Sequence, residues 1–451
     1  MLAGSLELRT NEIERLIAAN ELNTATKRVM DFVSDFAANR KRKQEAIDIR
    51  ASYNALREEN RRYGKTDEES QELSRLRYRI MEFLDIVKDE SPVTEEVKFD
   101  RVVKESSVPS ISDAKTGKIN KTIYEWEKEE FKRQHSKASA PSSIIFHGKD
   151  IKKKYGGKSI DFTFSLPELV LKPGEITAIV GENGNGKTTL LRIVAGQLQI
   201  NEGKIKYPLL TSNEKKDLYS IKQQIAYIPQ ELPRWTGLLA ENLHFSAAIH
   251  GIKGDKNEEE VDFIVNRLGL EKYTNVTWNE ISGGYRMRFA LAKALVWNPK
   301  LLILDEPLAN LDINTQLTFL RDLRYLADSI TNLKSIVISS QNLHNVEEIA
   351  DNIIFIQNGS AAYYGKMKDF GQDRKENSFE FACKLSKDAL ADILENTPWN
   401  QLEEVGFSYI LDTPINVTAN DILSIFVKQN VVVTYFRDIS KSTRKLFKLE
   451  K

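Results

Sequence analysis

The stretch that decides the fold reads ITAIV (176–180), then GENGNGKTT (181–189), then LLRIVA (190–195). A β-rich apolar run, a glycine-rich loop and a helical run follow one another, in the order that a phosphate-binding loop requires. Glycines let the backbone N–H groups turn inward around an anion, and the following helix presents its positive end to it. The sequence therefore predicts an α/β nucleotide-binding domain built around this loop.

The polar side chains of the loop predict how a nucleotide would be held. Lys187 would reach the β and γ phosphate oxygens as a point charge, and the hydroxyl of Thr188 would ligate Mg²⁺. The expected cofactors are ATP and Mg²⁺. The other expected nucleotide contacts in the loop are Gly181, Asn183, Gly184, Asn185, Gly186 and Thr189.

A second motif supplies the acids. The aliphatic run LLIL (301–304) is followed directly by Asp305 and Glu306, so both carboxylates are expected at the end of a buried strand. This is the Walker B arrangement, in which Asp305 would hold Mg²⁺ through water and Glu306 would polarise the attacking water.

Composition limits the class of protein. The chain has 451 residues, 65 basic and 65 acidic, and therefore no net field that would attract nucleic acid. The single cysteine, Cys383, excludes an internal disulfide framework, suits a reducing compartment and is expected to be a buried core thiol. No signal pattern and no apolar run of membrane-spanning length is seen, so we expect a cytoplasmic protein.

Periodicity divides the chain into four parts. Apolar residues recur at helical spacing in the first part, which predicts an all-α bundle of about four helices. A polar, proline-interrupted stretch predicts a linker, and alternating strands and helices predict a central α/β P-loop domain followed by a small α+β domain. The expected boundaries are 1–90, 91–143, 144–365 and 366–451.

Short runs rich in β-forming residues predict the strands. In the central domain we expect buried strands over 175–180, 224–228, 301–304, 335–339 and 353–357. In the last part we expect strands near 379–385, 407–412 and 431–437, with helices near 387–395, 419–429 and 440–447.

The motif that narrows the family is ISGGYRMR (281–288), shortly before the acidic strand. It resembles the signature motif of ATP-binding-cassette (ABC) proteins. Ser282 and the N–H groups of Gly283 and Gly284 begin a helix and form a second anion site, too far along the chain to serve the same ATP. The resemblance implies an ABC-type domain with a helical subdomain, which pairs head to tail as a homodimer. Tyr285 departs from the usual glutamine.

Three further residues match the family in the correct order. Tyr155 matches the aromatic that stacks on adenine, with core packing as the alternative. Gln230 matches the loop glutamine that senses Mg²⁺ and the attacking water, with a solvent-facing loop residue as the alternative. Asp312 matches the aspartate that bridges the dimer interface.

One position departs from the family in a way that affects catalysis. After the strand 335–339 the family usually places a histidine against the γ-phosphate, whereas this chain has Gln341 there. A glutamine can donate one hydrogen bond but carries no charge, so we expect active but slower hydrolysis, with Glu306, Gln341 and Lys187 as catalytic residues. His344 is the alternative if the loop bulges.

The resemblance implies a conformational cycle driven by ATP hydrolysis. We expect the ATPase subunit of a transporter, peripheral to the inner membrane through a separate permease, because residues 235–245 lie where family members contact a membrane partner. The last domain resembles those of ABC-2-type exporters. The N-terminal bundle resembles bacterial effector-associated, death-domain-like adaptors, which leaves an ABC ATPase of an immunity or signalling system, with an adaptor-domain partner, as the alternative. A bundle with a purely structural role is a further alternative.

Overall fold

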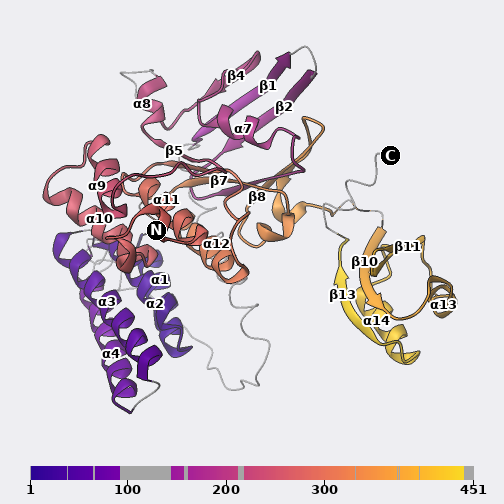
Figure 1. Cartoon of the computed structure of the whole chain (residues 1–451), viewed down its shortest axis with the longest axis horizontal. Coiled ribbons are helices and arrows are strands. Elements are labelled where there is room, and N and C mark those ends of the chain that lie inside the picture. Colours follow the sequence, from indigo (N-terminus) through magenta and orange to yellow (C-terminus); the bar gives the residue numbers. More distant parts are fainter. Residues whose placement is uncertain are drawn as a thin grey trace, which may run out of the picture.

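The computed structural model describes residues 2–37, 39–63, 67–91, 144–156, 161–211, 218–330, 332–372, 374, 376–395 and 397–440. Figure 1 shows three parts in the described residues: a helical bundle, a central α/β domain and a small sheet domain. The expected linker lies outside the described residues except for Ser91, as does the expected helix at 440–447 except for Ser440.

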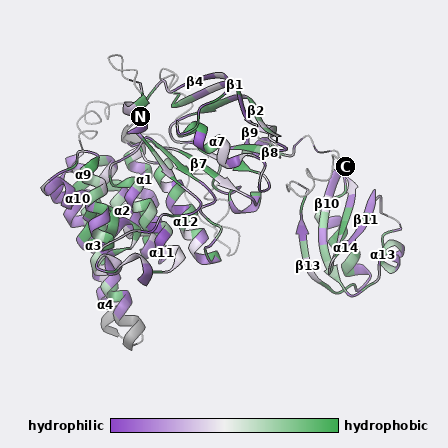
Figure 2. Cartoon of the chain, turned by 45° about the horizontal axis from the view of Figure 1, so that its top comes forward, coloured by the Kyte–Doolittle hydropathy of each residue, from purple (hydrophilic) through white to green (hydrophobic). Residues whose placement is uncertain are grey.

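The N-terminal part is a bundle of four helices, as the sequence predicted. They are α1 (Leu2–Ala18), α2 (Leu22–Phe36), α3 (Arg40–Tyr63) and α4 (Asp67–Glu90). Each carries both hydrophobic and hydrophilic residues along its length (Figure 2). The apolar stripes meet in one core, where Ile13, Val29, Val33, Ile80 and Leu84 are almost fully buried.

The central domain is built on a nine-stranded mixed sheet of order β4-β1-β2-β9-β8-β3-β7-β6-β5 within the described residues. The strands are β1 (Phe146–Gly156), β2 (Asp161–Leu171), β3 (Ile176–Val180), β4 (Glu202–Lys206), β5 (Ile225–Ile228), β6 (Leu301–Leu304), β7 (Ser335–Ser340), β8 (Asn352–Gln357) and β9 (Ser360–Lys366). The sequence predicted the buried strands β3, β5, β6, β7 and β8. It did not predict β1, β2, β4 and β9, which pair antiparallel or lie at the edge and lack a continuous apolar run.

Strand register places the chemistry at one edge of this sheet. β3 lies between β7 and β8, and β6 lies between β5 and β7, all in parallel pairs. Val180 is paired with Ser340, and Leu304 with both Ile228 and Ile338. The carboxyl ends of β3, β5, β6 and β7 therefore open onto the same edge, where ligands of parallel sheets bind.

Helices cover this sheet and form the helical subdomain. They are α7 (Lys187–Val194), α8 (Leu218–Lys222), α9 (Leu239–Ile249), α10 (Asp255–Leu268), α11 (Gly283–Leu295) and α12 (Ile313–Ala327), with short 3-10 turns η1 (Glu271–Tyr273), η2 (Trp278–Glu280), η3 (Leu343–Asn345) and η4 (Met367–Asp369). Leu243, Leu268, Phe289 and Leu323 from α9 to α12 share one hydrophobic cluster with Leu302 of β6. The subdomain is thus packed against the sheet.

The C-terminal part is a four-stranded antiparallel sheet of order β11-β12-β10-β13 with two helices. Its elements are β10 (Glu376–Cys383), α13 (Lys387–Ile393), β11 (Gln401–Val405), β12 (Ser408–Pro414), α14 (Ala419–Lys428) and β13 (Val433–Asp438). The α+β prediction is confirmed, although β11 was missed. Cys383 was expected to be a buried core thiol, and this was wrong: it lies at the end of β10 and is only partly buried.

The bundle packs directly on the central domain. Lys27 of α2 forms a buried ion pair with Asp322 of α12, at 3.0 Å between Nζ and Oδ1. Phe263 of α10 belongs to the hydrophobic core of the bundle. Figure 1 shows the bundle beside α10 and α12. Among the described helices, none is both long enough and apolar enough to span a bilayer.

Candidate active site

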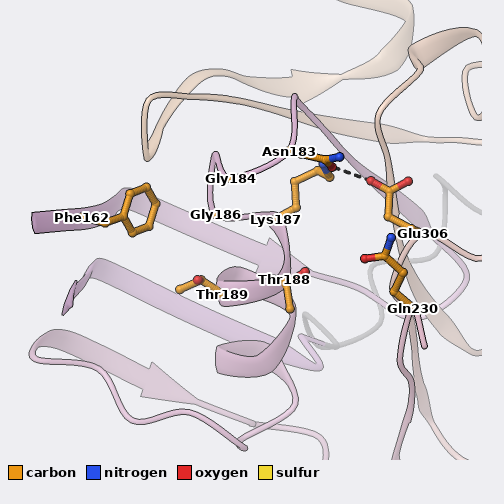
Figure 3. A pocket seen from close by; sticks show the side chains of 9 residues that line it. All are labelled: Phe162, Asn183, Gly184, Gly186, Lys187, Thr188, Thr189, Gln230 and Glu306. Atoms are coloured by element: carbon orange, nitrogen blue, oxygen red, sulfur yellow. Dashed lines mark ion pairs between the residues drawn. The ribbon is translucent and has the colours of Figure 1, made fainter. Parts of the chain in front are cut away.

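A pocket with a volume of about 400 Å³ opens at the carboxyl edge of the sheet (Figure 3). The loop after β3 forms one wall, and residues that follow β5 and β6 form the other. Its lining residues are Phe162, Asn183, Gly184, Gly186, Lys187, Thr188, Thr189, Gln230 and Glu306. All of these except Phe162 were expected at the site from sequence, so the fold brings the predicted residues together.

Lys187 joins the loop to the acidic end of β6. Its ammonium donates hydrogen bonds to the carbonyl oxygens of Gly181 at 2.7 Å and Glu182 at 3.2 Å. Nζ also lies 3.0 Å from Oε1 of Glu306, the pair drawn as a dashed line in Figure 3. Both side chains are buried, so the pair is little screened. A phosphate entering the loop would compete with Glu306 for this ammonium.

Asp305 is held by three hydroxyl groups. Thr188 donates to Oδ2 at 2.8 Å, Tyr227 donates to the same oxygen at 3.2 Å, and Ser339 donates to Oδ1 at 2.8 Å. Burial and the nearby Asp305 carboxylate raise the pKa of the Tyr227 hydroxyl, which keeps it protonated and able to donate. The carboxylate is therefore fixed in position next to the hydroxyl of Thr188.

Sequence reasoning missed Tyr227 and Ser339. Tyr227 lies on β5 and Ser339 on β7, the two parallel neighbours of β6. The hydroxyl of Ser339 also accepts the backbone N–H of Glu306 at 2.7 Å. Strand register is the signal that could have found them. Polar residues near the carboxyl ends of β5 and β7 lie beside the carboxylates that follow β6.

The backbone of Glu306 adopts an uncommon conformation. Its φ is 46°, in the left-handed region that residues other than glycine rarely enter. Such strain persists where the surroundings determine the backbone, and it is concentrated at functional sites. Here the hydrogen bond from the Glu306 N–H to Ser339 and the ion pair with Lys187 hold the residue.

The three predicted loop glycines are needed for different reasons. A Cβ on Gly181 would lie 2.4 Å from the carbonyl oxygen of Ile356 on β8, so this glycine allows the loop to pack on the sheet. Gly186 has a φ of 103°, and its Cβ would lie 2.9 Å from Phe164. Gly184 has a φ of 80° but faces open space. Only Gly184 therefore leaves its surroundings free for a ligand.

This difference predicts the behaviour of two alanine variants. Gly181→Ala should destabilise the central domain by about 3 kcal/mol, because the new methyl group would clash with the backbone carbonyl of Ile356, which β8 holds in place. The matched Gly184→Ala should cost about 1 kcal/mol of backbone strain and mainly weaken ATP binding. Thermal unfolding without nucleotide and ATP titration separate the two effects, and equal stability losses would contradict the packing role of Gly181.

Two aromatic side chains stand where adenine stacking was expected. Tyr155, the predicted residue, is 38% exposed, so core packing does not describe it. Its hydroxyl lies 3.4 Å from Oγ1 of Thr189, but Tyr155 does not line the pocket. Phe162 does line it, and the two rings are 6.2 Å apart. Phe162 was missed because its position beside Tyr155 comes from the pairing of β1 with β2.

Alanine substitutions should show which ring contacts the base. Stacking of an aromatic side chain on a base stabilises binding by about 1–3 kcal/mol, so Tyr155→Ala or Phe162→Ala should weaken ATP binding about tenfold if that ring stacks. We expect both rings to contribute. Tyr78→Ala, at an exposed position of α4, is the control. Unchanged affinity in both Tyr155→Ala and Phe162→Ala would place adenine elsewhere.

The signature residues lie outside the pocket of their own chain. Ser282 precedes α11 and is exposed, with no side-chain hydrogen bond to its own helix. A Cβ on Gly284 would lie 3.1 Å from Cγ2 of Thr315, and a Cβ on Gly283 would lie 3.4 Å from the Asn310 carbonyl oxygen. The start of α11 therefore packs closely on the segment that leads into α12.

Asp312 caps α12 in this segment. Its carboxylate accepts hydrogen bonds from the backbone N–H of Thr315 at 3.0 Å and from its hydroxyl at 2.5 Å. These hydrogen bonds lower the pKa of Asp312 and keep it ionised. Asp312 is exposed, as is Ser282, and the predicted bridging role needs such an exposed carboxylate.

Gln230 and Gln341 are placed differently. Gln230 lines the pocket two residues after the end of β5. Gln341 directly follows β7, is exposed and does not line the pocket. The rival His344 lies in η3, where its Nδ1 is 2.6 Å from Oε1 of Glu347.

From the switch position assigned to Gln341 by the sequence, we expect Gln341→His to increase the rate of hydrolysis. A histidine at this position would add a stronger donor toward the terminal phosphate, with a gain in kcat of up to about 10²-fold. His344→Ala should leave kcat unchanged. Steady-state phosphate release measures both. A Gln341→His variant that is no faster would argue against the switch assignment.

Comparison with known proteins identifies the family. The model of the family described as "ABC transporter" matches residues 166–309. The phosphonates import ATP-binding protein PhnC of Fusobacterium nucleatum is 30% identical over 243 residues, which cover 51% of this chain and 95% of that protein. The chain belongs to the ABC transporter family.

One further relative and one solved structure are similar to this ABC ATPase. The uncharacterised ABC transporter ATP-binding protein YxlF of Bacillus subtilis is 28% identical over 276 residues, or 60% of this chain and 89% of that protein. A dimeric structure of the ATP-binding cassette MJ0796 bound to ADP and Pi has a TM-score of 0.45 at 22% identity, covering 49% of this chain and 99% of that one.

The family fixes the activity at the level of the domain. This ABC ATPase domain binds ATP, and ATP hydrolysis is its expected activity. The matched range contains the loop 181–189, Ser282 and both acids, while Tyr155, Asp312 and Gln341 lie outside it. The roles of individual residues stay predictions.

Proposed function

We propose that the chain is the ATP-hydrolysing subunit of an ABC transporter, in which two copies pair head to tail. Each ATP would be held by the loop 181–189 of one chain and by Ser282 to Gly284 of the other. The observation that supports this most is the position of Ser282 and Asp312. Both are exposed, both stand at the start of a helix, and neither lines the pocket of its own chain.

The residues of the pocket fit Mg²⁺. The hydroxyl of Thr188 and the carboxylate of Asp305 are 2.8 Å apart, and both are the hard oxygen donors that Mg²⁺ prefers. Mg²⁺ usually keeps several waters and binds through one or two carboxylates together with substrate phosphates. When bound, Mg²⁺ would neutralise charge that develops on the phosphates. Gln230 would lie beside it.

The chain's own residues would divide the chemistry as follows. Lys187 would bind the β and γ phosphate oxygens and release Glu306 from its ion pair. Glu306 would then accept a hydrogen bond from the attacking water and orient it. Ser282 of the facing copy would donate to the terminal phosphate from the start of α11. Hydrolysis would therefore require both copies.

A separate membrane chain is the partner we propose for this ATPase. Helix α9 buries Leu239 and Leu243 but leaves Phe245 65% and Ile249 59% exposed. This apolar face follows Gln230, so a partner seated on it could sense the nucleotide. The PhnC relative is named as an import protein. We place the ATPase at the cytoplasmic side of the membrane, with no direct role for nucleic acid.

The bundle's adaptor role stays a prediction. Faces of α2 and α3 are occupied by the ATPase domain, through Lys27 with Asp322 and Lys43 with Glu260. Arg9 of α1 also donates to the carbonyl oxygen of Asp328, after α12. We therefore expect a partner bundle on another protein to bind through α4.

The decisive variant for the shared site is Glu306→Gln. The amide keeps the size of the side chain but cannot polarise water, so ATP should still bind, turnover should fall below detection, and a dimer should accumulate with ATP. Light scattering with and without ATP, together with phosphate release, measures this. Glu347→Gln, next to His344, is the matched control and should hydrolyse normally.

Two results would contradict the proposal. Unchanged turnover in Glu306→Gln would remove Glu306 from its assigned role. A monomer at saturating ATP that hydrolyses at full rate in the unmodified protein would exclude the head-to-tail site.

A further inference from the structure

Helix α2 connects two separate parts of the ATPase domain. Lys27 and Asp31 are one helical turn apart and lie on the same side of α2. Lys27 binds Asp322 of α12 at 3.0 Å, and Asp31 accepts from Arg267 of α10 at 2.6 Å. The side chains of Lys27 and Asp322 are 9% and 5% exposed. One turn of α2 therefore holds α10 and α12 at once.

Neighbouring contacts extend this bridge along both helices. Toward α12, the guanidinium of Arg28 lies 4.0 Å from the centre of the Tyr325 ring. Toward α10, Lys43 of α3 lies 2.8 Å from Oε1 of Glu260. After α10, the amide of Asn54 donates to Glu271 at 2.9 Å. The contact therefore combines ion pairs, a cation–π contact and a hydrogen bond along both helices.

These contacts bear on the pocket because of what α10 is attached to. The segment 231–281 contains α9 and α10 and connects Gln230, a pocket residue that follows β5, to Ser282, the predicted contact with the facing nucleotide, which precedes α11. We expect a movement of this segment to be transmitted to the residues at both of its ends. Asp312, six residues after Glu306, is the residue that caps the start of α12. By contacting both α10 and α12, the bundle therefore connects the segment 231–281 to the helix that follows Asp305 and Glu306.

We propose that the N-terminal bundle is a built-in clamp that restrains the helical segment 231–281 against α12 and thereby slows the ATPase cycle of its own chain. Closure around a nucleotide takes place by small rigid-body shifts of packed segments. A bridge across two such segments opposes the shift for as long as it is docked. This inference rests on the proposed function, because it takes Gln230 and Ser282 as parts of the nucleotide site.

The buried ion pair between Lys27 and Asp322 offers a way to undock the bundle by substitution. Burial lowers the pKa of Lys27 even though Asp322 acts in the opposite direction. A buried ion pair that loses one partner leaves an uncompensated charge, whereas replacing both partners by apolar residues is often neutral. Lys27→Met should therefore undock the bundle, and Lys27→Met with Asp322→Leu should leave it docked.

The test uses the full chain with Glu306 intact. Hydrogen exchange of α2 and α10 reports docking, and phosphate release reports turnover. Lys27→Met should raise exchange in both helices and raise kcat by about fivefold or more. The double variant should match the unmodified protein in both, and so should the control Arg75→Ala, in an exposed pair on α4. Lys43→Met breaks a less buried ion pair and should give a smaller rise in exchange and in kcat. It provides the test if Lys27→Met folds poorly.

Three outcomes would overturn the clamp. Exchange could rise while kcat stays constant or falls, which would make the bundle a passive support. The double variant could be as fast as Lys27→Met, so that the rate would not follow docking. Exchange could stay unchanged in both Lys27→Met and Lys43→Met, so that these ion pairs would not hold the bundle. Failure of the proposed function itself would appear separately, as a Glu306→Gln protein that hydrolyses ATP normally.

Discussion

The hydrogen bond between the hydroxyl of Thr188 and the carboxylate of Asp305 is the interaction on which the site depends. It joins the loop after β3 to the end of β6, two segments more than a hundred residues apart in sequence. The parallel sheet makes it possible, because β7 lies between these strands and brings their carboxyl ends to one edge. The Lys187–Glu306 pair makes a second link across the same gap.

Much of this arrangement could be predicted from the sequence. The strands around the site are buried on both faces, so ITAIV, LLIL and SIVIS read as continuous apolar runs, and the motif residues directly follow them. β1 could not be found in this way, because FHGKDIKKKYG carries one aspartate and four lysines and therefore has no continuous apolar run. Phe162, Tyr227 and Ser339 were missed because their contribution comes from strand pairing, which no local spacing reveals.

The docking of the bundle was also beyond sequence analysis, for a physical reason. Periodicity predicts which face of a helix is buried, but the face that carries Lys27 and Asp31 is charged and reads as solvated. These charges are buried only because α12 and α10 supply opposite charges from residues near 322 and 267. Specificity here comes from paired charges in a low-dielectric interface, where an unpaired partner would be strongly unfavourable.

The central claim is that one chain supplies the loop and another supplies the signature residues of each nucleotide site. Mixing two inactive variants tests it most directly: Lys187→Ala, which lacks the loop lysine, and Ser282→Arg, which blocks the signature helix. A head-to-tail dimer of the two contains one site with an intact loop and an intact signature, so the mixture should hydrolyse ATP while each variant alone does not. A mixture as inactive as its components would contradict the account.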